Sequence, residues 1–121
     1  MHGTDTTEIL SDIPDKQDLA KVSDLLCQLG DPSRLRLFWI LCHCEECVIN
    51  LSAIMEMSSP AVLHHLKRLR AIGLIQNRRS GKEMYYRAAD TEEVHLLHDM
   101  VEKILSMSCP SPNDQKGNNR I

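Results

Sequence analysis

Three cysteines and a histidine stand within six consecutive residues near the middle of the chain. Cys44 and Cys47 are separated by two residues, a spacing at which two thiolates can reach one soft ion, and Cys42 and His43 precede them. This segment predicts a site for a thiophilic metal ion or metalloid, or a redox-active thiol. The alternative is that Cys42 closes a buried helix as a small apolar residue and that the other thiols are incidental. The sequence leaves both interpretations open.

A second group of possible metal ligands lies closer to the C-terminus. His95, His98, Asp99 and Glu102 recur at spacings of three and four, which places them on one face of a helix. Imidazole and carboxylate groups bind divalent metals, so His95, His98 and Glu102 are candidate ligands. The alternative is that this face is only the solvated side of an amphipathic helix.

The positive charge is concentrated in one part of the chain. The formal net charge is -3, yet residues 58–87 contain seven Lys and Arg residues and a single acidic one, Glu83. A chain that separates its charge in this way presents a basic surface to a polyanion and an acidic body elsewhere. We expect that polyanion to be duplex DNA. An enzyme is not expected, because no nucleophile with a spaced base, glycine-rich phosphate loop or pair of carboxylates stands out.

The basic segment coincides with a helix-turn-helix pattern over residues 50–73. Apolar residues at helical spacing lead to Ser58, Ser59 and Pro60, which supply an N-cap and a proline suited to a first helical turn. The second helix then buries Val62, Leu66, Leu69 and Ile72 and turns a basic, polar face outward. Such a helix is how a helix-turn-helix enters the major groove.

A β-hairpin is predicted directly after this helix. Residues 74–79 and 83–87 alternate loosely, and Ser80-Gly81 makes the turn between them. A hairpin in this position is a wing, and Arg78, Arg79 and Lys82 would lie where they can contact phosphate or enter a minor groove. Val48-Ile49 is expected to be a short extended segment before the helix-turn-helix.

Three further helices are predicted around this core. One begins at Lys16 and ends at Gly30, a second is opened by Asp31-Pro32, and a third runs from Glu92 to about Met107. The last helix lacks a partner for its apolar stripe within one chain, so we expect a homodimer through the first and last helices. We predict a flexible arm over residues 1–15, one domain over 16–107 and a disordered tail over 108–121.

Composition supports a cytoplasmic protein without a membrane segment. No run of about eighteen apolar residues occurs, and the N-terminal residues are acidic and polar, unlike a signal peptide. The five cysteines are an odd number, and we expect thiols or metal ligands rather than a disulfide framework.

The order of elements and several short motifs resemble the ArsR/SmtB family of bacterial repressors. The motifs are Gly30-Asp31-Pro32-Ser33-Arg34-Leu35-Arg36, Ser58-Ser59-Pro60-Ala61-Val62, His64-His65-Leu66-Lys67-Arg68-Leu69, Gly73-Leu74-Ile75 and Gly81-Lys82. The resemblance implies a mainly helical winged helix-turn-helix fold with a small β-hairpin wing. It also implies a homodimer on an inverted-repeat operator, and many members release DNA when they bind a metal or metalloid.

The resemblance also assigns DNA contacts and sensor positions. Expected contacts lie on the recognition helix and the wing: Ser58, Ser59, Ala61, Val62, Leu63, His64, His65, Lys67, Arg68, Arg78, Arg79 and Lys82. Leu63 departs from the serine frequent in the family, although an apolar side chain can contact a thymine methyl group. The family's thiol motif Cys-Val-Cys reads Cys47-Val48-Ile49 here, without the second thiolate. Its second metal site maps to Asp90, Glu92 and Glu102, without a histidine.

Two functions follow from these patterns. The first is a sequence-specific repressor whose inducer, a thiophilic metal or metalloid or a redox signal, releases it from DNA. The alternative is a zinc-stabilised protein-interaction module that does not bind DNA.

Overall fold

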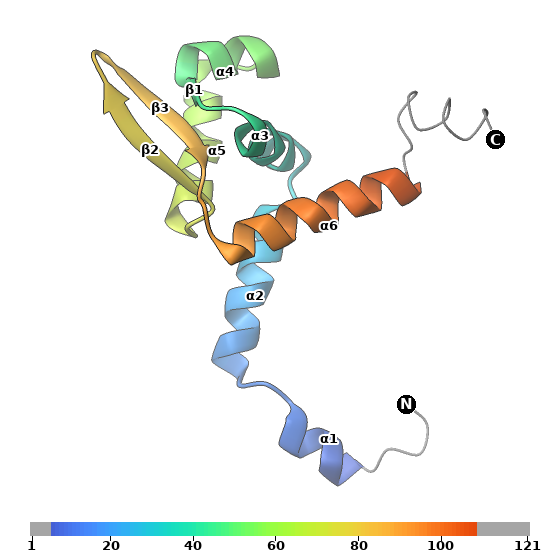
Figure 1. The fold of residues 1–121 in the computed structure, drawn as a ribbon. Helices are drawn as coiled ribbons and strands as arrows, with labels where there is room; N and C mark the ends of the chain where they lie inside the picture. Colours follow the sequence, from blue (N-terminus) through green and yellow to red (C-terminus); the bar gives the residue numbers. More distant parts are fainter. Residues whose placement is uncertain (1–5, 109–121) are drawn as a thin grey trace, which may run out of the picture.

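The computed structural model describes residues 6–108, which form six helices and one small sheet at the side of the helical core (Figure 1). The elements are α1 (Thr6–Asp12), α2 (Lys16–Gln28), α3 (Pro32–His43), β1 (Glu46–Cys47), α4 (Val48–Met55), α5 (Ser59–Ala71), β2 (Ile75–Ser80), β3 (Glu83–Ala88) and α6 (Glu92–Ser108). The predicted tail beyond Ser108 lies outside the described residues.

Helices α3, α5 and α6 begin where a capping side chain accepts from a free backbone N–H group. The Asp31 carboxylate accepts from the Arg34 N–H at 3.0 Å and opens α3, whose first residue is Pro32. Ser58 Oγ accepts from the Ala61 N–H at 3.3 Å and opens α5, and Thr91 does the same for Val94 at the start of α6. These starts confirm the boundaries predicted from the sequence.

The sheet has three antiparallel strands in the order β1-β3-β2. In the β2–β3 hairpin Ser80 pairs with Glu83, and Gly81 occupies the tight turn with a φ of +63°, a conformation that glycine adopts without strain. β1 pairs Glu46 with Tyr86 and Cys47 with Tyr85. The expectation of an extended segment at Val48-Ile49 is wrong by two residues: the strand ends at Cys47, and Val48 is the first residue of α4.

The core lies where α3, α4, α5 and the sheet meet. Leu37, Phe38, Leu51, Leu66 and Leu74 are each at most 1% exposed. α3 supplies the centre, with Leu37, Phe38 and Leu41 buried, and α4 and α5 pack on it as the two helices of a helix-turn-helix.

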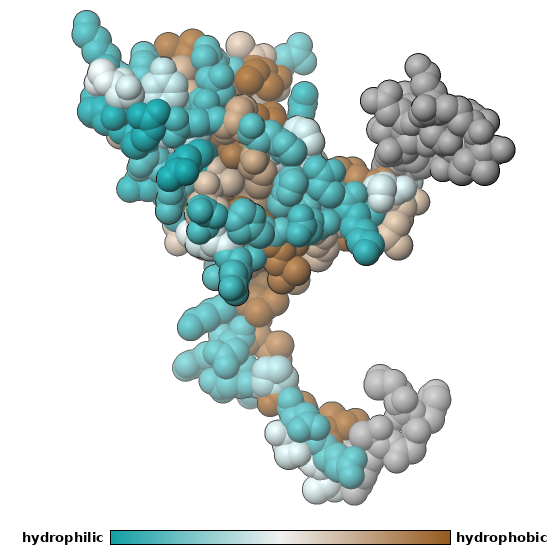
Figure 2. Space-filling view, viewed as in Figure 1, coloured by the Kyte–Doolittle hydropathy of each residue, from teal (hydrophilic) through white to brown (hydrophobic). Residues whose placement is uncertain are grey.

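The N-terminal helices extend away from this core (Figure 1). α2 has no buried residue, and it exposes Leu19, Val22 and Leu26 by about half each. α1 was not expected, because the sequence showed no periodic pattern over residues 1–15. Figure 2 shows apolar residues at the surface along α1, α2 and the edge of α6, a pattern that suits helices with a further partner.

Candidate functional site

The outward face of α5 is the basic surface that the sequence predicted. Leu63, His64, Lys67 and Arg68 are exposed, whereas Leu66 and Leu69 on the opposite side are buried. Arg68 Nε donates to His64 Nε2 at 3.2 Å across one helical turn, which places a cation and an imidazole side by side on this face. The helix therefore presents cations, an imidazole and an apolar side chain on one exposed side.

Two residues expected to contact DNA do not reach this face. Val62 is 0% exposed and His65 is 8% exposed, because positions 62, 65, 66 and 69 share the core side of the helix. His65 Nδ1 instead accepts from Arg34 Nε of α3 at 3.3 Å, and burial lowers the pKa of His65. Their assignment as DNA contacts is corrected: Val62 packs in the core, and His65 connects two helices.

The remaining candidate DNA contacts of the recognition helix lie at the start of α5. Ser58 is exposed, although its hydroxyl already caps the helix, and Ser59 and Ala61 are half-buried. Ser59 Oγ donates to Ser52 Oγ of α4 at 3.4 Å. These small residues lie at the corner between α4 and α5, and Ser59 joins the two helices through Ser52.

The wing carries its cations at and beside the turn. Arg79 and Lys82 are exposed and form no ion pair with any of the described residues. Arg78 differs, because its guanidinium donates to both carboxylate oxygens of Glu45, at 2.6 and 2.9 Å. This pairing, which the sequence analysis did not anticipate, lowers the pKa of Glu45 and ties the wing to the segment that follows α3.

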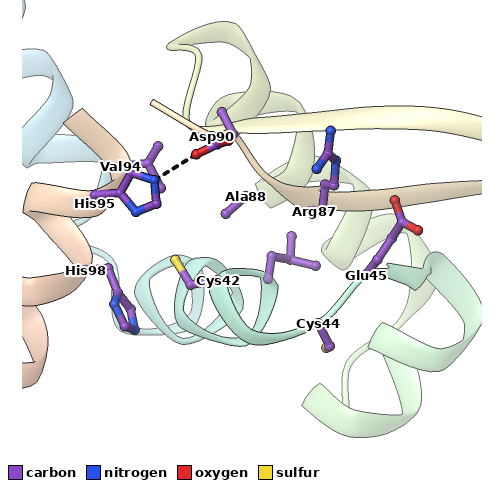
Figure 3. A pocket seen from close by; sticks show the side chains of 11 residues that line it. Cys42, Cys44, Glu45, Arg87, Ala88, Asp90, Val94, His95 and His98 are labelled. Carbon is purple, nitrogen blue, oxygen red and sulfur yellow. Dashed lines mark hydrogen bonds and ion pairs between the residues drawn. The ribbon is translucent and has the colours of Figure 1, made fainter. Parts of the chain in front are cut away.

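The three cysteines occupy different environments. Cys42 is half-buried on α3, Cys44 is exposed, and Cys47 is buried in β1. Cys42 and Cys44 both line a cavity of about 280 Å³, but Cys42 lies near the α6 histidines and Cys44 at the other end (Figure 3). Burial raises the pKa of the Cys42 thiol to about 11, which opposes the thiolate form that binds soft metals. Within residues 6–108 no thiol lies in a group of three or more His, Cys, Asp or Glu ligand atoms close enough to share a metal ion.

A different set of side chains does converge. Of the groups of three or more His, Cys, Asp and Glu residues in the described part of the chain, only His43, His98 and Glu102 bring their ligand atoms within 4.8 Å of one another. Sequence reasoning selected His98 and Glu102 but joined them to His95, which instead pairs with Asp90 at 2.8 Å (Figure 3). His43 takes the place of His95 in the cluster. The position of His43 between Cys42 and Cys44 was the only sequence signal that it could be a metal ligand.

A helix-turn-helix followed directly by a β-hairpin, with cations on the outward helix and on the hairpin, defines a winged helix-turn-helix DNA-binding protein. Residues 31–77 match the family model described as bacterial regulatory protein, arsR family. The chain is 31% identical over 104 residues to the transcriptional repressor SmtB homolog of Synechocystis sp., covering 86% of this chain and 79% of that relative. It belongs to the arsR family of DNA-binding transcriptional repressors.

Other relatives and solved structures agree. The chain is 34% identical over 88 residues to the repressor SmtB of Mycobacterium tuberculosis, covering 73% of this chain and 65% of that protein. It is also 34% identical to the cadmium resistance regulatory protein CadC homolog of Staphylococcus aureus, covering 68% of this chain and 72% of that protein. The homodimeric winged helix-turn-helix domain Mb0332 from Mycobacterium bovis superposes with a TM-score of 0.69 at 25% identity. The superposition covers 80% of this chain and 91% of that domain. In the described part of this chain, no helix has the length and apolar character that a membrane span needs.

Proposed function

We propose that the protein is a homodimeric repressor that binds an inverted-repeat operator through α5 and the wing and releases it when an inducer binds. The observation that carries this proposal is the exposed cationic face of α5, continued by Arg79 and Lys82 on the hairpin. Lys and Arg residues on such a surface neutralise phosphates, while Leu63 and His64 face the same side and can contact base edges.

A twofold dimer fits the surfaces that the core leaves exposed. α2 and α6 together expose Leu19, Val22, Leu26, Met100 and Ile104, each by 40% or more. Covering these side chains with a second copy would place two α5 helices on one side of the dimer, and half-sites about one helical turn apart, or multiples of it, would follow. The homodimeric relative from M. bovis supports this arrangement.

In this function the inducer is a metal ion. A cadmium resistance regulator is among the relatives, and this chain gathers His43, His98 and Glu102 in one cluster. The separated thiols give less support to the thiophilic or redox inducer that the cysteine motif suggested. Family membership sets aside the alternative of an interaction module that does not bind DNA.

The test is selection of bound sequences from a library of duplexes with a randomised centre, followed by fluorescence anisotropy on the winning duplex. We expect a sequence with dyad symmetry and an affinity that falls steeply with salt. Arg68→Glu should reduce the affinity at least tenfold, whereas Lys21→Glu, an equal charge change on α2, should have little effect. A selected site without dyad symmetry, or equal losses in both variants, would contradict the proposal.

A further inference from the structure

The His43, His98 and Glu102 side chains meet where the end of α3 faces α6. His43 is the last residue of α3, and His98 and Glu102 lie one turn apart on α6. The distances are 2.9 Å between the two Nε2 atoms, 3.2 Å from His98 Nε2 to Glu102 Oε1, and 3.6 Å from His43 Nε2 to the same oxygen. Three potential ligand atoms thus form one small triangle.

The size of this triangle suits a tetrahedral metal ion. Bonds of 2.0–2.1 Å from zinc to nitrogen or oxygen, at tetrahedral angles, separate neighbouring ligand atoms by about 3.3 Å. The three observed separations lie on both sides of that value. Two imidazole Nε2 atoms that face each other need a shared proton or a cation between their lone pairs, and the carboxylate of Glu102 adds the negative charge that favours the cation.

Neighbouring side chains lie against all three candidate ligands. Trp39 Nε1 donates to Glu102 Oε1 at 3.2 Å, and the Trp39 ring packs against the His43 ring with centroids 4.0 Å apart. Asp99 Oδ1 lies 3.9 Å from His98 Nδ1, on the side of that ring away from the cluster. Such partners fix the tautomer and orientation of metal ligands. His43 and Glu102 are each 43% exposed, so solvent can supply a fourth ligand.

We propose that His43, His98 and Glu102 bind one divalent ion of the zinc class per chain. Two imidazoles and one carboxylate favour zinc, cobalt or nickel over a soft thiophilic ion, and the site has too few oxygen ligands for calcium. The cluster contains no cysteine, so it is separate from the thiols of the Cys42–Cys47 segment. It also differs from the Asp90, Glu92 and Glu102 positions that family resemblance points to.

Because of where this site lies, a bound ion can change the affinity for DNA. This regulatory role rests on the proposed repressor function. A bound ion would fix the end of α3 to α6, which carries part of the exposed apolar surface of the expected dimer. The segment directly after His43 holds Glu45, which is paired with Arg78 of the wing, and then leads into α4. The ion would therefore stabilise one spacing of the two recognition helices relative to the dimer interface.

Cobalt(II) titration of the chelator-treated 121-residue chain tests the site without DNA. We expect one Co²⁺ per chain, visible absorption typical of a tetrahedral ion, no sulfur-to-cobalt charge-transfer band, and displacement by Zn²⁺. His43→Asn, His98→Gln and Glu102→Gln should each weaken binding at least tenfold. Glu102→Gln keeps an acceptor for Trp39, and circular dichroism checks that each variant is folded. His95→Gln, a histidine on the same helix outside the cluster, is the matched control and should bind as the wild type does.

Several outcomes would overturn the inference. These are no Co²⁺ uptake by the folded wild type, a thiolate charge-transfer band, or equal affinities in His95→Gln and His98→Gln. Duplex binding is measured separately on the metal-free protein and again with Zn²⁺. Intact DNA binding with no metal uptake would refute the metal site alone, whereas metal uptake without DNA binding would refute the repressor. An operator affinity that Zn²⁺ shifts less than twofold would refute the regulatory extension.

Discussion

Arg34 Nε donates a hydrogen bond to His65 Nδ1 at 3.3 Å, so a buried polar contact joins α3 to the recognition helix. The Arg34 guanidinium also donates to the backbone carbonyl and the side-chain oxygen of Gln28, at 3.1 and 2.8 Å. One side chain thereby connects the end of α2, the start of α3 and the core side of α5. The bond requires His65 to be neutral, with Nδ1 as the acceptor.

This contact predicts a pH dependence of stability. Burial lowers the pKa of His65 from its ordinary 6.5, and the nearby cations Arg34 and Arg68 act in the same direction, as does His64, while Asp31 opposes them. The unfolded chain then binds the proton more tightly than the folded one. The free energy of unfolding should be unaffected by His65 above pH 6.5, fall as the pH drops below 6.5, and level off below the lowered pKa. Urea unfolding at a series of pH values measures this.

The control for that experiment is the neighbouring histidine. His65→Gln keeps an oxygen acceptor for Arg34 Nε and removes the proton equilibrium, so the acid-side loss of stability should become smaller than in the wild type. His64 is an exposed residue of the same helix, and His64→Gln should keep the acid-side loss of stability seen in the wild type. Equal pH profiles in the wild type and His65→Gln would show that the buried contact does not depend on protonation.

Two adjacent apolar residues of α5 should have opposite phenotypes. Val62 is 0% exposed and Leu63 is 41% exposed. Val62→Ala should lower the free energy of unfolding by about 2 kcal/mol, because it removes buried methyl groups from a packed core. Leu63→Ala should change stability by less than about 0.5 kcal/mol and instead alter the base preference in duplex selection. A large loss of stability in Leu63→Ala together with a changed base preference in Val62→Ala would mean that α5 is rotated from the orientation described.

The ion pair between Arg78 and Glu45 predicts a gain of DNA affinity. Glu45→Gln removes a negative charge and one strong partner of Arg78, which frees that guanidinium for phosphate. The affinity for the selected operator should rise several-fold, and the slope of its salt dependence should steepen by about one. Glu83→Gln, also on the hairpin but without an ion pair to any described residue, is the matched control. An equal gain in both variants would indicate a general charge effect.

The exposed apolar residues of α2 and α6 predict a loss of the dimer on mutation. Leu26→Asp or Ile104→Asp should convert the protein to a monomer in light scattering, because each places a charge in the expected interface. Ile49→Asp on α4 is a control of similar exposure, at 64%, outside this surface. A protein that stays dimeric in the first two variants and dissociates in the third would contradict the interface.

Local sequence patterns were sufficient for most of the fold. The Asp31 and Ser58 caps, the glycine turn of the hairpin and the apolar spacing of α5 each act over a few residues, so periodicity and capping rules located them. The same rules missed α1 and misplaced the strand before α4. β1 is only two residues long and depends on pairing with β3, which no local pattern encodes.

A basic recognition helix and a basic wing in a small helical domain could be predicted from the residues alone, because helical period and charge are properties of neighbouring residues. Which side chains meet across the chain depends on the packing of the folded protein. That packing turned His65 inward to Arg34, paired Arg78 with Glu45, separated the three thiols, and brought His43 to Glu102 and to His98, which is 55 residues further along the chain. Contacts at that separation depend on how α3 and α6 pack, and that packing is set by the whole core rather than by any one segment.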